Sequence, residues 1–301
     1  MRVITGLDFK LDYQTAVCIG KFDGLHRGHR TLIQAAKRTG LATVLFTFLI
    51  PDSRTLYSYE EKKFLAEKLG IDILVAVPIT PEFMHMRPET FVEDILIGRC
   101  RAAKICVGSD FRFGYQRRGD VKLLQKMAGE NDFSVEVFEK VRQNGEIISS
   151  TRIRALLDKG EIREANELLG TPYFLQGTVI SGNQLGRKKT VPTANLMPEA
   201  GKVLPPFGVY AVMVQAGSHW YQAVGNLGVK PTVSGDNPAG LEVWLFDYDG
   251  NLYGQKLTAY FYEFQRPEKK FASMEELKQQ IEKDTVRAKE ILLLQGGEVP
   301  F

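Results

Sequence analysis

The sequence predicts two domains of different fold class. We expect an N-terminal α/β domain with a doubly wound, mostly parallel sheet, and a small C-terminal β-barrel followed by a terminal helix. The chain of 301 residues is long enough for two domains. Strand-like and helix-like segments alternate through its first half, whereas short strand-like runs separated by Gly, Pro and Asn follow after residue 172. We therefore assign residues 1–170 to the first domain and 171–301 to the second.

The predicted strands of the first domain are short apolar runs rich in branched side chains. They cover residues 16–20, 42–48, 73–77, 104–107 and 134–138. Helical patterns lie between them at 28–39, 58–69, 88–98 and 119–131. Ligands of a doubly wound sheet bind at the carboxyl ends of its strands. We therefore expect functional residues in the loops that follow the first and the fourth of these strands.

The second domain shows short strand-like runs with turn signals between them, a pattern typical of a small barrel. The runs are 174–180, 208–215, 220–224, 241–246 and 255–264. A long amphipathic helix follows over 273–294, and Ser-Met-Glu-Glu at its start is a capping-box pattern. We interpret the basic residues of this helix as a solvated face.

Net charge, cysteine content and the lack of long apolar runs indicate which kinds of partner and location to expect. The formal net charge of +3 is small and evenly spread, so we expect no nucleic-acid partner. Cys18, Cys100 and Cys106 match neither a disulfide framework nor a zinc site, and we predict buried, reduced thiols. The N-terminus lacks a signal-peptide pattern, and no apolar run reaches transmembrane length. We therefore expect a cytoplasmic protein without a membrane partner, and the sequence leaves self-association open.

The most informative segment is Gly-Lys-Phe-Asp-Gly-Leu-His-Arg-Gly-His at residues 20–29, which holds two of the four histidines. A glycine between the imidazoles, on the first turn of a helix, lets a phosphate reach free N–H groups and the positive end of the helix dipole. Two imidazoles can also donate hydrogen bonds to charge that grows during nucleotidyl transfer. The alternative is an ordinary strand–turn–helix with surface histidines. The predicted nucleotide-binding residues are Gly20, Phe22, Asp23, Gly24, His26, Gly28 and His29.

A second segment, Ser-Ser-Thr-Arg-Ile-Arg at residues 149–154, opens a helix that runs to about residue 159. Ser150 or Thr151 would cap this helix, and Arg154 would lie one turn further on, where a docked polyphosphate would meet it. Alone, the segment is as well explained by an ordinary N-cap with a solvated arginine. Together with the histidine segment, it resembles the adenylyltransferase branch of the HxGH nucleotidyltransferases, which have a Rossmann-like fold.

The segment Val-Pro-Thr-Ala-Asn-Leu at residues 191–196 is the second chemical centre. We predict a rigid turn that presents the Thr193 hydroxyl and the Asn195 amide oxygen, hard ligands that suit Mg²⁺. Upstream, Gly182, Gly186 and Arg187 lie in a glycine-spaced stretch through which phosphates could reach backbone N–H groups. In isolation, Pro-Thr-Ala-Asn is equally well explained as a plain turn.

In this order, the motifs resemble the prokaryotic bifunctional riboflavin kinase/FAD synthetase family, from about residue 16 to residue 294. The kinase part rests on Gly177, Gly182, Leu185-Gly186-Arg187, Pro192-Thr193-Ala194-Asn195, Gly208-Val209-Tyr210, Asn226-Leu227-Gly228, Pro231-Thr232, Leu241-Glu242-Val243 and Leu252-Tyr253-Gly254. The resemblance implies that the barrel is a flavokinase, which phosphorylates riboflavin with MgATP to give FMN. It further implies that the first domain joins FMN and ATP to give FAD and pyrophosphate.

For the kinase, the resemblance assigns the metal and phosphates to Thr193 and Asn195, and flavin binding to Asn226 and Arg266. Glu242 lies in an alternating strand, where it could accept the proton of the ribityl hydroxyl or could be a solvated glutamate.

For the adenylyltransferase, the resemblance assigns the α-phosphoryl group to the two histidines. Ser150, Thr151 and Arg154 would hold the β- and γ-phosphates. Asp110 takes the place of a polar residue near the nucleotide.

Two stretches depart from the family pattern. Leu-Ile-Pro-Asp at residues 49–52 stands where the family has Pro-His-Pro, and Thr190-Val191 replaces the usual Gly-Phe or Gly-Tyr before Pro-Thr-Ala-Asn. A threonine in place of a glycine with positive φ costs about 1–3 kcal/mol of strain or weakens nucleotide binding. We expect adenylylation to be the slower activity. Two alternatives stay open: a flavokinase with a silent adenylyltransferase module, and a flavin-sensing regulator.

Overall fold

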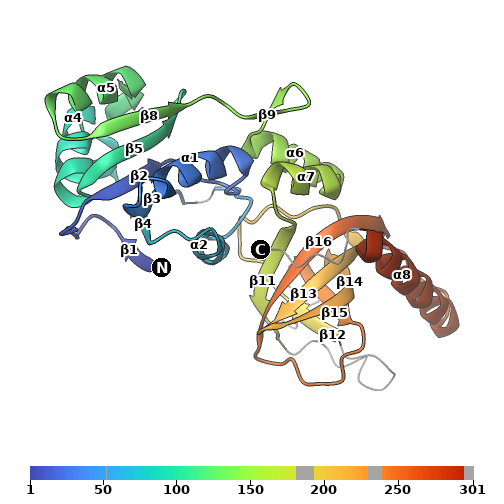
Figure 1. Cartoon of the computed structure of the whole chain (residues 1–301). Helices are drawn as coiled ribbons and strands as arrows, with labels where there is room; N and C mark the ends of the chain where they lie inside the picture. The colour runs from blue at the N-terminus through green and yellow to red at the C-terminus, as the bar shows by residue number, and fades with distance from the viewer. Residues whose placement is uncertain (52, 181–192, 230–238, 295–301) are drawn as a thin grey trace. The chain divides into compact units, whose positions relative to one another are not determined.

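The computed structural model describes residues 1–51, 53–180, 193–229 and 239–294, and it divides the chain into two compact units, Met1–Ser150 and Thr151–Phe301 (Figure 1). The boundary predicted after residue 170 differs from this division. Helix α7 (Ile162–Leu169) and all of α6 (Ser150–Lys159) after its first residue lie in the second unit. Asn166 of α7 explains the difference, because its amide donates to the Phe261 carbonyl at 2.8 Å and accepts from the Tyr173 N–H at 2.7 Å.

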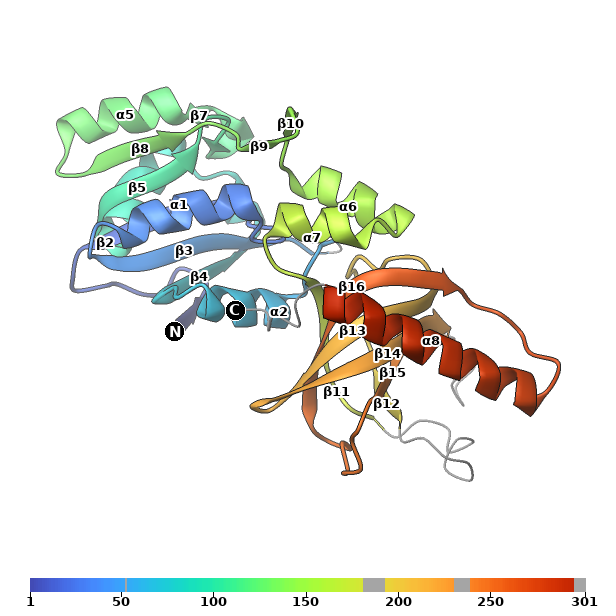
Figure 2. The same ribbon diagram turned by 45° about the vertical axis from the view of Figure 1, so that its right-hand side comes forward.

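The first unit contains a six-stranded parallel sheet of order β1-β4-β3-β2-β5-β8, which confirms the predicted doubly wound α/β class (Figure 2). The strand order reverses at β2, so the loops after β2 and β5 lie at a topological switch point. The strands are β1 (Arg2–Thr5), β2 (Thr15–Ile19), β3 (Ala42–Leu49), β4 (Ile73–Pro78), β5 (Ala102–Gly108) and β8 (Ser134–Phe138).

The helices between these strands follow the predicted alternation. The predicted segment 88–98 is a short α-helix that continues as a π-helix, in which the Cys100 N–H bonds to the Ile95 carbonyl at 2.8 Å. The helices are α1 (Arg27–Lys37), α2 (Tyr59–Lys68), α3 (Pro81–Met84), α4 (Pro88–Thr90), η1 (Phe91–Arg99), η2 (Tyr115–Arg117) and α5 (Val121–Glu130). Short ribbons are β6 (Arg112–Phe113), β7 (Gly119–Asp120), β9 (Arg142–Gln143) and β10 (Glu146–Ile147).

The core of the first unit explains why its strands are apolar throughout. Val17, Val44 and Ile105 lie side by side in register and join one hydrophobic cluster with side chains of η1 and α5. Helix α1 adds no residue to this cluster and packs against β2, β3 and β5, so both faces of the sheet are covered. The three cysteines are free and buried, as predicted for Cys18 and Cys106, and these two lie opposite each other in register.

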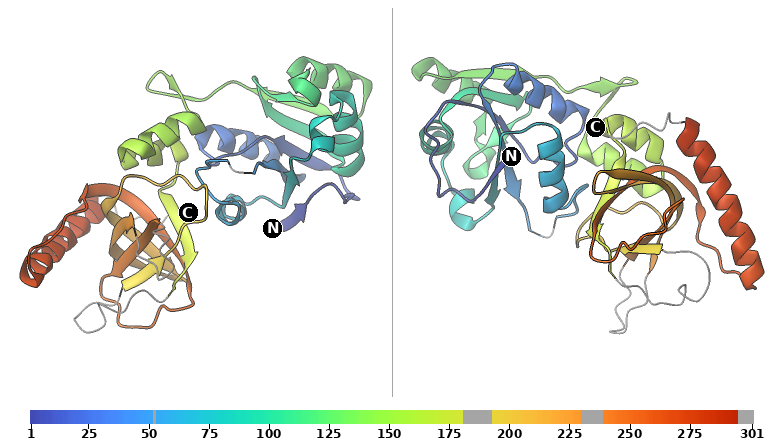
Figure 3. Two further views of the ribbon diagram at one scale, coloured as in Figure 1. Left: turned by 180° about the vertical axis from the view of Figure 1, so that it is seen from behind. Right: turned by 60° about the horizontal axis from the view of Figure 1, so that its bottom comes forward.

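The second unit is a curled antiparallel sheet of order β11-β16-β13-β14-β15-β12, which confirms the predicted small barrel (Figure 3). A bridge in which the Ile180 N–H donates to the Asn195 carbonyl at 3.1 Å joins its two edges. Helix α8 packs against β13, β14 and β16. The elements are β11 (Tyr173–Thr178), β12 (Thr193–Leu196), β13 (Gly208–Ala216), β14 (His219–Val229), β15 (Ala239–Leu245), β16 (Lys256–Pro267) and α8 (Met274–Leu294).

Two local predictions need correction. Thr193 to Leu196 form strand β12 and not a turn, because they pair in register with residues 241–244 of β15. The capping box predicted at the start of α8 forms only in part. The Ser273 hydroxyl accepts from the Glu276 N–H at 3.1 Å, but the Glu276 carboxylate accepts from the Ala272 N–H at 3.0 Å.

Candidate functional sites

The loop between β2 and α1 is held in an unusual backbone conformation. Phe22 and Leu25 have positive φ angles of 46° and 43°, and Gly24 has 90°. For the two non-glycine residues such angles cost about 1–3 kcal/mol each and persist only where the surroundings fix them. Both side chains are 1% exposed, and the Arg30 Nε–H donates to the Leu25 carbonyl at 3.1 Å. Packing therefore holds a strained turn directly before the histidine pair.

The two histidines stack on each other at the start of α1. Their ring centroids lie 3.6 Å apart with an interplanar angle of 17°. His26 is the N-cap, and its Nδ1 accepts a hydrogen bond from the His29 N–H at 3.4 Å. A Cβ on Gly28 would lie 3.2 Å from Cε1 of His26. The glycine between the histidines therefore makes room for the stacked ring, in addition to any room that it leaves for a phosphate.

Burial keeps both imidazoles neutral. It lowers the pKa of His26 to about 4, and the nearby Arg30 charge adds to this effect. It also lowers the pKa of His29, with smaller contributions from His26 and Lys62. Because Nδ1 of neutral His26 accepts a hydrogen bond, its proton resides on Nε2, which is then a donor. Nδ1 of His29 is buried and has no hydrogen-bond partner among the residues that the structure describes.

Asp23 anchors the same loop. Its carboxylate accepts from the Leu56 N–H at 2.8 Å, and its backbone carbonyl accepts from the Ser150 hydroxyl at 2.8 Å. Earlier in the loop, the Gly20 N–H donates to the Phe46 carbonyl at 3.1 Å and so extends the pairing of β2 with β3. These bonds connect the loop to β3, to residue 56 and to the first residue of α6.

The predicted cap of α6 needs correction. The helix begins at Ser150, so the position before it belongs to Ser149, and neither Ser150 nor Thr151 is the cap. The Ser150 hydroxyl instead donates to Asp23. Thr151 and Arg154 lie on one face of α6, where an Arg154 Nη2–H donates to the Thr151 hydroxyl at 3.4 Å. This face offers a hydroxyl and a guanidinium, two donors that suit a phosphate.

Asp110 follows β5 at the carboxyl edge of the sheet, as predicted. Its carboxylate pairs with the Lys140 ammonium at 2.7 Å, and both side chains are exposed. An exposed pair of this kind stabilises the fold little and leaves both groups accessible to a ligand.

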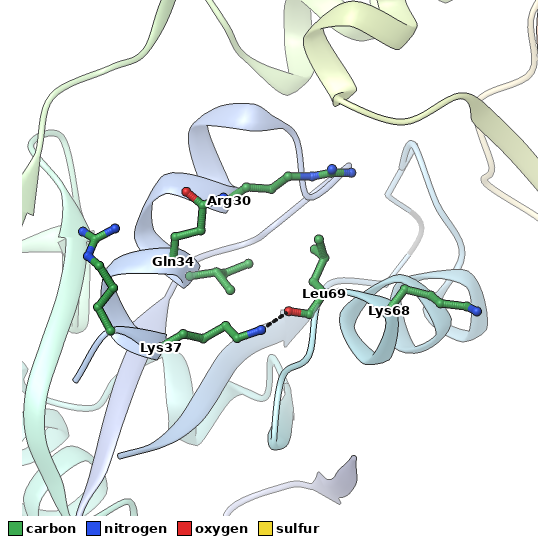
Figure 4. A pocket seen from close by; sticks show the side chains of 7 residues that line it. Arg30, Gln34, Lys37, Lys68 and Leu69 are labelled. Carbon is green, nitrogen blue, oxygen red and sulfur yellow. Dashed lines mark hydrogen bonds between the residues drawn. The ribbon is translucent and has the colours of Figure 1, made fainter. Parts of the chain in front are cut away.

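An open depression of about 450 Å³ lies between α1 and α2 (Figure 4). The Lys37 ammonium crosses it and donates to the Leu69 carbonyl at 3.0 Å. Its lining contains none of the predicted nucleotide-binding residues and consists of Arg30, Ile33, Gln34, Lys37, Arg38, Lys68 and Leu69. The depression is therefore a basic surface along α1 and does not mark the histidine site.

Strands β12, β15 and β14 bring the predicted kinase residues together in the second unit. Glu242 of β15 lies opposite Asn195 of β12 on one side and opposite Asn226 of β14 on the other. The Thr193 hydroxyl donates to the Glu242 carboxylate at 2.8 Å. Thr193 and Asn195 are half-buried, whereas the alternate residues Ala194 and Leu196 are buried. The four polar side chains therefore share one face of the sheet, opposite the core.

This face fits the donor set that Mg²⁺ requires. A hydroxyl, an amide oxygen and a carboxylate are all hard oxygen ligands, and Mg²⁺ is usually held by one or two protein groups together with substrate phosphates. Within the described ranges, no group of three or more His, Cys, Asp or Glu residues could hold a metal ion. The phosphate-loop residues predicted for this site, Gly182, Gly186 and Arg187, lie outside the described residues.

The two predicted flavin-binding residues have partners of their own. The Asn226 amide lies 3.5 Å from the Glu268 carboxylate. Arg266 binds the buried Asp284 carboxylate of α8 through Nε at 2.9 Å and Nη2 at 2.6 Å. Gln280 also donates to Asp284, at 2.9 Å. Arg266 thus connects β16 to α8, and its role toward a flavin stays a prediction.

Sequence reasoning missed Lys62, a buried lysine of α2. Its ammonium donates to the Lys21 carbonyl at 2.9 Å and lies 3.4 Å from the Thr47 hydroxyl. In the sequence it stands within Glu-Glu-Lys-Lys, a charge run that normally indicates a solvated helix face. No local pattern distinguishes this lysine from its neighbour.

Comparisons with known proteins agree with the two-unit architecture. Residues 8–152 match the family model described as FAD synthetase, and residues 169–292 match the one described as riboflavin kinase. The bifunctional riboflavin kinase/FMN adenylyltransferase of Escherichia coli K12 is 36% identical over 287 residues, covering 90% of this chain and 91% of the relative. The enzyme of the same description from Listeria monocytogenes is 33% identical over 287 residues, covering 91% of each chain.

A solved structure is similar over nearly the whole chain. It is a crystal structure described as a macrolide-efflux protein from Streptococcus pneumoniae, with a TM-score of 0.84 and 28% identity. The match covers 96% of this chain and 99% of that chain. In the part of this chain that the structure describes, no helix combines the length and apolarity needed to span a bilayer.

Proposed function

The chain belongs to the family of bacterial bifunctional riboflavin kinase/FMN adenylyltransferases, and we propose that its second unit phosphorylates riboflavin to FMN while its first unit adenylylates FMN to FAD. The observation that carries this conclusion is the match to both family models, in this order, on one chain. ATP is the second substrate of each reaction. We also propose a cytoplasmic location, which rests on the sequence.

In the kinase, Glu242 acts as the general base. Its carboxylate accepts the proton of the ribityl 5′-hydroxyl as that oxygen attacks the γ-phosphorus of ATP, and ADP leaves. The hydrogen bond from Thr193 fixes the orientation of the carboxylate. Thr193 and Asn195 would hold Mg²⁺, which neutralises phosphate charge when bound. Asn226 lies next to Glu242 in register and contacts the flavin in this proposal, as does Arg266.

In the adenylyltransferase, an oxygen of the FMN phosphate attacks the α-phosphorus of ATP, and pyrophosphate leaves. The attacking oxygen is already ionised, so the reaction needs no general base. It does need hydrogen-bond donors for the charge on the α-phosphoryl oxygens. Neutral His26 offers its Nε2–H, and His29 stacks on it. Ser150, Thr151 and Arg154 hold the β- and γ-phosphates in this proposal.

The geometry of both candidate sites argues against the two alternatives, a flavokinase with a silent adenylyltransferase module and a flavin-sensing regulator. A silent adenylyltransferase module would have no use for two buried, stacked imidazoles behind a strained turn. A flavin sensor would not need a Thr193–Glu242 pair on the kinase face. Both features favour turnover over binding alone.

Product analysis tests this function. Purified protein is incubated with riboflavin and MgATP, and riboflavin, FMN and FAD are separated by chromatography over time. We expect FMN first and then FAD. If folded protein that binds riboflavin forms neither product, the proposal is wrong. FMN without FAD would support the kinase with a silent first unit.

A further inference from the structure

Lys62 and Glu61 are the two buried charged side chains of α2. Glu61 is accounted for by the helix cap, where its carboxylate accepts from the Ser58 N–H at 2.9 Å. Lys62 is only 8% exposed, whereas its neighbour Lys63 is partly exposed and pairs with Glu60 at 2.8 Å. Lysine side chains are almost never fully buried unless they are paired, because the protein interior solvates an ammonium poorly. The position of Lys62 therefore requires an explanation.

The contacts of Lys62 lie at the carboxyl ends of β2 and β3. The ammonium donates to the Lys21 carbonyl at 2.9 Å and lies 3.4 Å from the Thr47 hydroxyl, which itself donates to Lys21 at 3.0 Å. Both partners are neutral oxygens. Within the described residues, no carboxylate forms an ion pair with this ammonium. Lys62 thus brings a positive charge to the histidine loop that its direct contacts do not neutralise.

The charged groups around this point are few. Burial lowers the pKa of Lys62, and the more distant Asp23 carboxylate opposes this effect. His29 is affected by the positive charge of Lys62 from α2 and by His26 from the start of α1, and both act with burial to lower the pKa of His29. His26 in turn is affected by Arg30. Lys62 is therefore the cation that acts on His29 from outside α1.

We propose that Lys62 is a positioning residue for adenylyl transfer, whose ammonium fastens the loop after β2 to β3 and brings a positive charge to the loop that leads into the stacked histidines. The inference rests on the proposed role of these histidines. Fastening Lys21 fixes the residues that follow it, up to the N-cap His26. The positive charge adds to burial, the main cause, in keeping His29 unprotonated, and it favours the approach of the anionic α-phosphate.

The test uses the full chain and three substitutions. Lys62→Met removes the charge at similar length, Lys62→Arg keeps the charge, and Lys63→Met is the matched control at the next position of α2. Histidine ring signals are followed by NMR over a pH range in each protein. The chain has only four histidines, so few ring signals need to be assigned. Adenylylation is measured with supplied FMN, and the kinase with riboflavin.

In Lys62→Met we expect the pKa of His29 to rise, because a positive neighbour is lost, and the acid limb of the adenylylation profile to move to higher pH. We expect kcat for FAD formation to fall by about 10²-fold, because a misplacement of the reacting groups by ~1 Å lowers the rate by about that factor. The KM for ATP should change little. Lys62→Arg should keep the low pKa of His29. Lys63→Met should match the unmodified protein, and all three should keep kinase activity.

Two results would overturn the inference. One is a folded Lys62→Met protein with unchanged His29 titration and FAD formation. The other needs no variant: in the unmodified protein, the pKa of His29 is not below the ordinary imidazole value of 6.5. This second measurement holds even if Lys62→Met does not fold. It also separates the inference from the proposed function, because a protein without FAD synthesis still reports the titration of His29.

Discussion

The Thr193 hydroxyl donates to the Glu242 carboxylate at 2.8 Å, across the pair formed by β12 and β15. The two residues are far apart in the sequence, and the antiparallel register brings them to the same face of the sheet. Asn195 lies on that face too, directly opposite Glu242. A carboxylate oriented by a hydroxyl, next to an amide oxygen, is what a general base beside a metal–phosphate site requires.

Glu242→Gln tests the role of this carboxylate. Glutamine keeps the shape and can still accept the hydrogen bond from Thr193, so we expect the fold to persist. FMN formation should fall by about 10²-fold or more, because the amide cannot accept the hydroxyl proton. Initial rates of FMN formation and the KM for riboflavin measure this effect. Glu275→Gln, at an exposed position of α8, is the control. An unchanged rate in Glu242→Gln would assign Glu242 to a solvated surface.

Gly28→Ala tests the histidine stack. The added methyl would lie 3.2 Å from the His26 ring, closer than ordinary van der Waals contact, and would displace the ring from its stacked position. We expect FAD formation to fall by about tenfold or more, because catalysis by positioning tolerates little displacement. FMN formation should not change. Gly129→Ala is the control, since a Cβ there meets nothing within 4 Å. A Gly28→Ala protein with full FAD synthesis would mean that the stack has no role in the reaction.

The lowered pKa of His26 predicts a pH-dependent stability. Its pKa falls from 6.5 to about 4, so the unfolded chain binds a proton more readily than the folded protein does. Stability should therefore decrease as the pH falls through this interval, by up to ~3 kcal/mol from this residue. Urea unfolding at several pH values measures the slope. His26→Gln should flatten it in this interval. Equal slopes in the two proteins would contradict the buried, neutral state of His26.

The loop after β3 predicts the balance of the two activities. Leu49 ends β3 and Ile50 is 38% exposed, where the family pattern has a histidine between prolines. An apolar loop offers fewer polar anchors for the FMN phosphate, so we expect adenylylation to be slower than phosphorylation. FMN should accumulate before FAD in a time course. Restoring Pro and His across residues 50–52 should raise the FAD rate and leave the kinase unchanged. FAD synthesis without a build-up of FMN would show that other residues anchor the phosphate.

The sequence predicted the α/β alternation well, because each buried strand of a covered parallel sheet is a continuous apolar run. It missed β1, whose four residues are mostly exposed and too few to show a pattern. It also predicted a turn for β12, because Pro-Thr-Ala-Asn has turn composition, while pairing with β15 makes the segment a strand.

The candidate site residues likewise could be predicted only where a local sequence pattern marks them. His26, Gly28 and His29 could be proposed as candidate site residues from their spacing alone. Lys62 could not, because nothing local tells a buried lysine from a solvated one. The position of Ser150 inside α6, and its bond to Asp23, depend on contacts between segments far apart in the sequence.

The central claim is that two separate sites carry out the two reactions, and parallel product analysis of His29→Ala and Glu242→Gln tests it most directly. Each variant is given riboflavin or FMN with MgATP, and the products are separated by chromatography. His29→Ala should form FMN at the normal rate but lose about 10²–10³ in the rate of FAD formation. Glu242→Gln should form FAD from supplied FMN but little FMN from riboflavin. If either substitution reduced both activities in a folded protein, the two-site account would be contradicted.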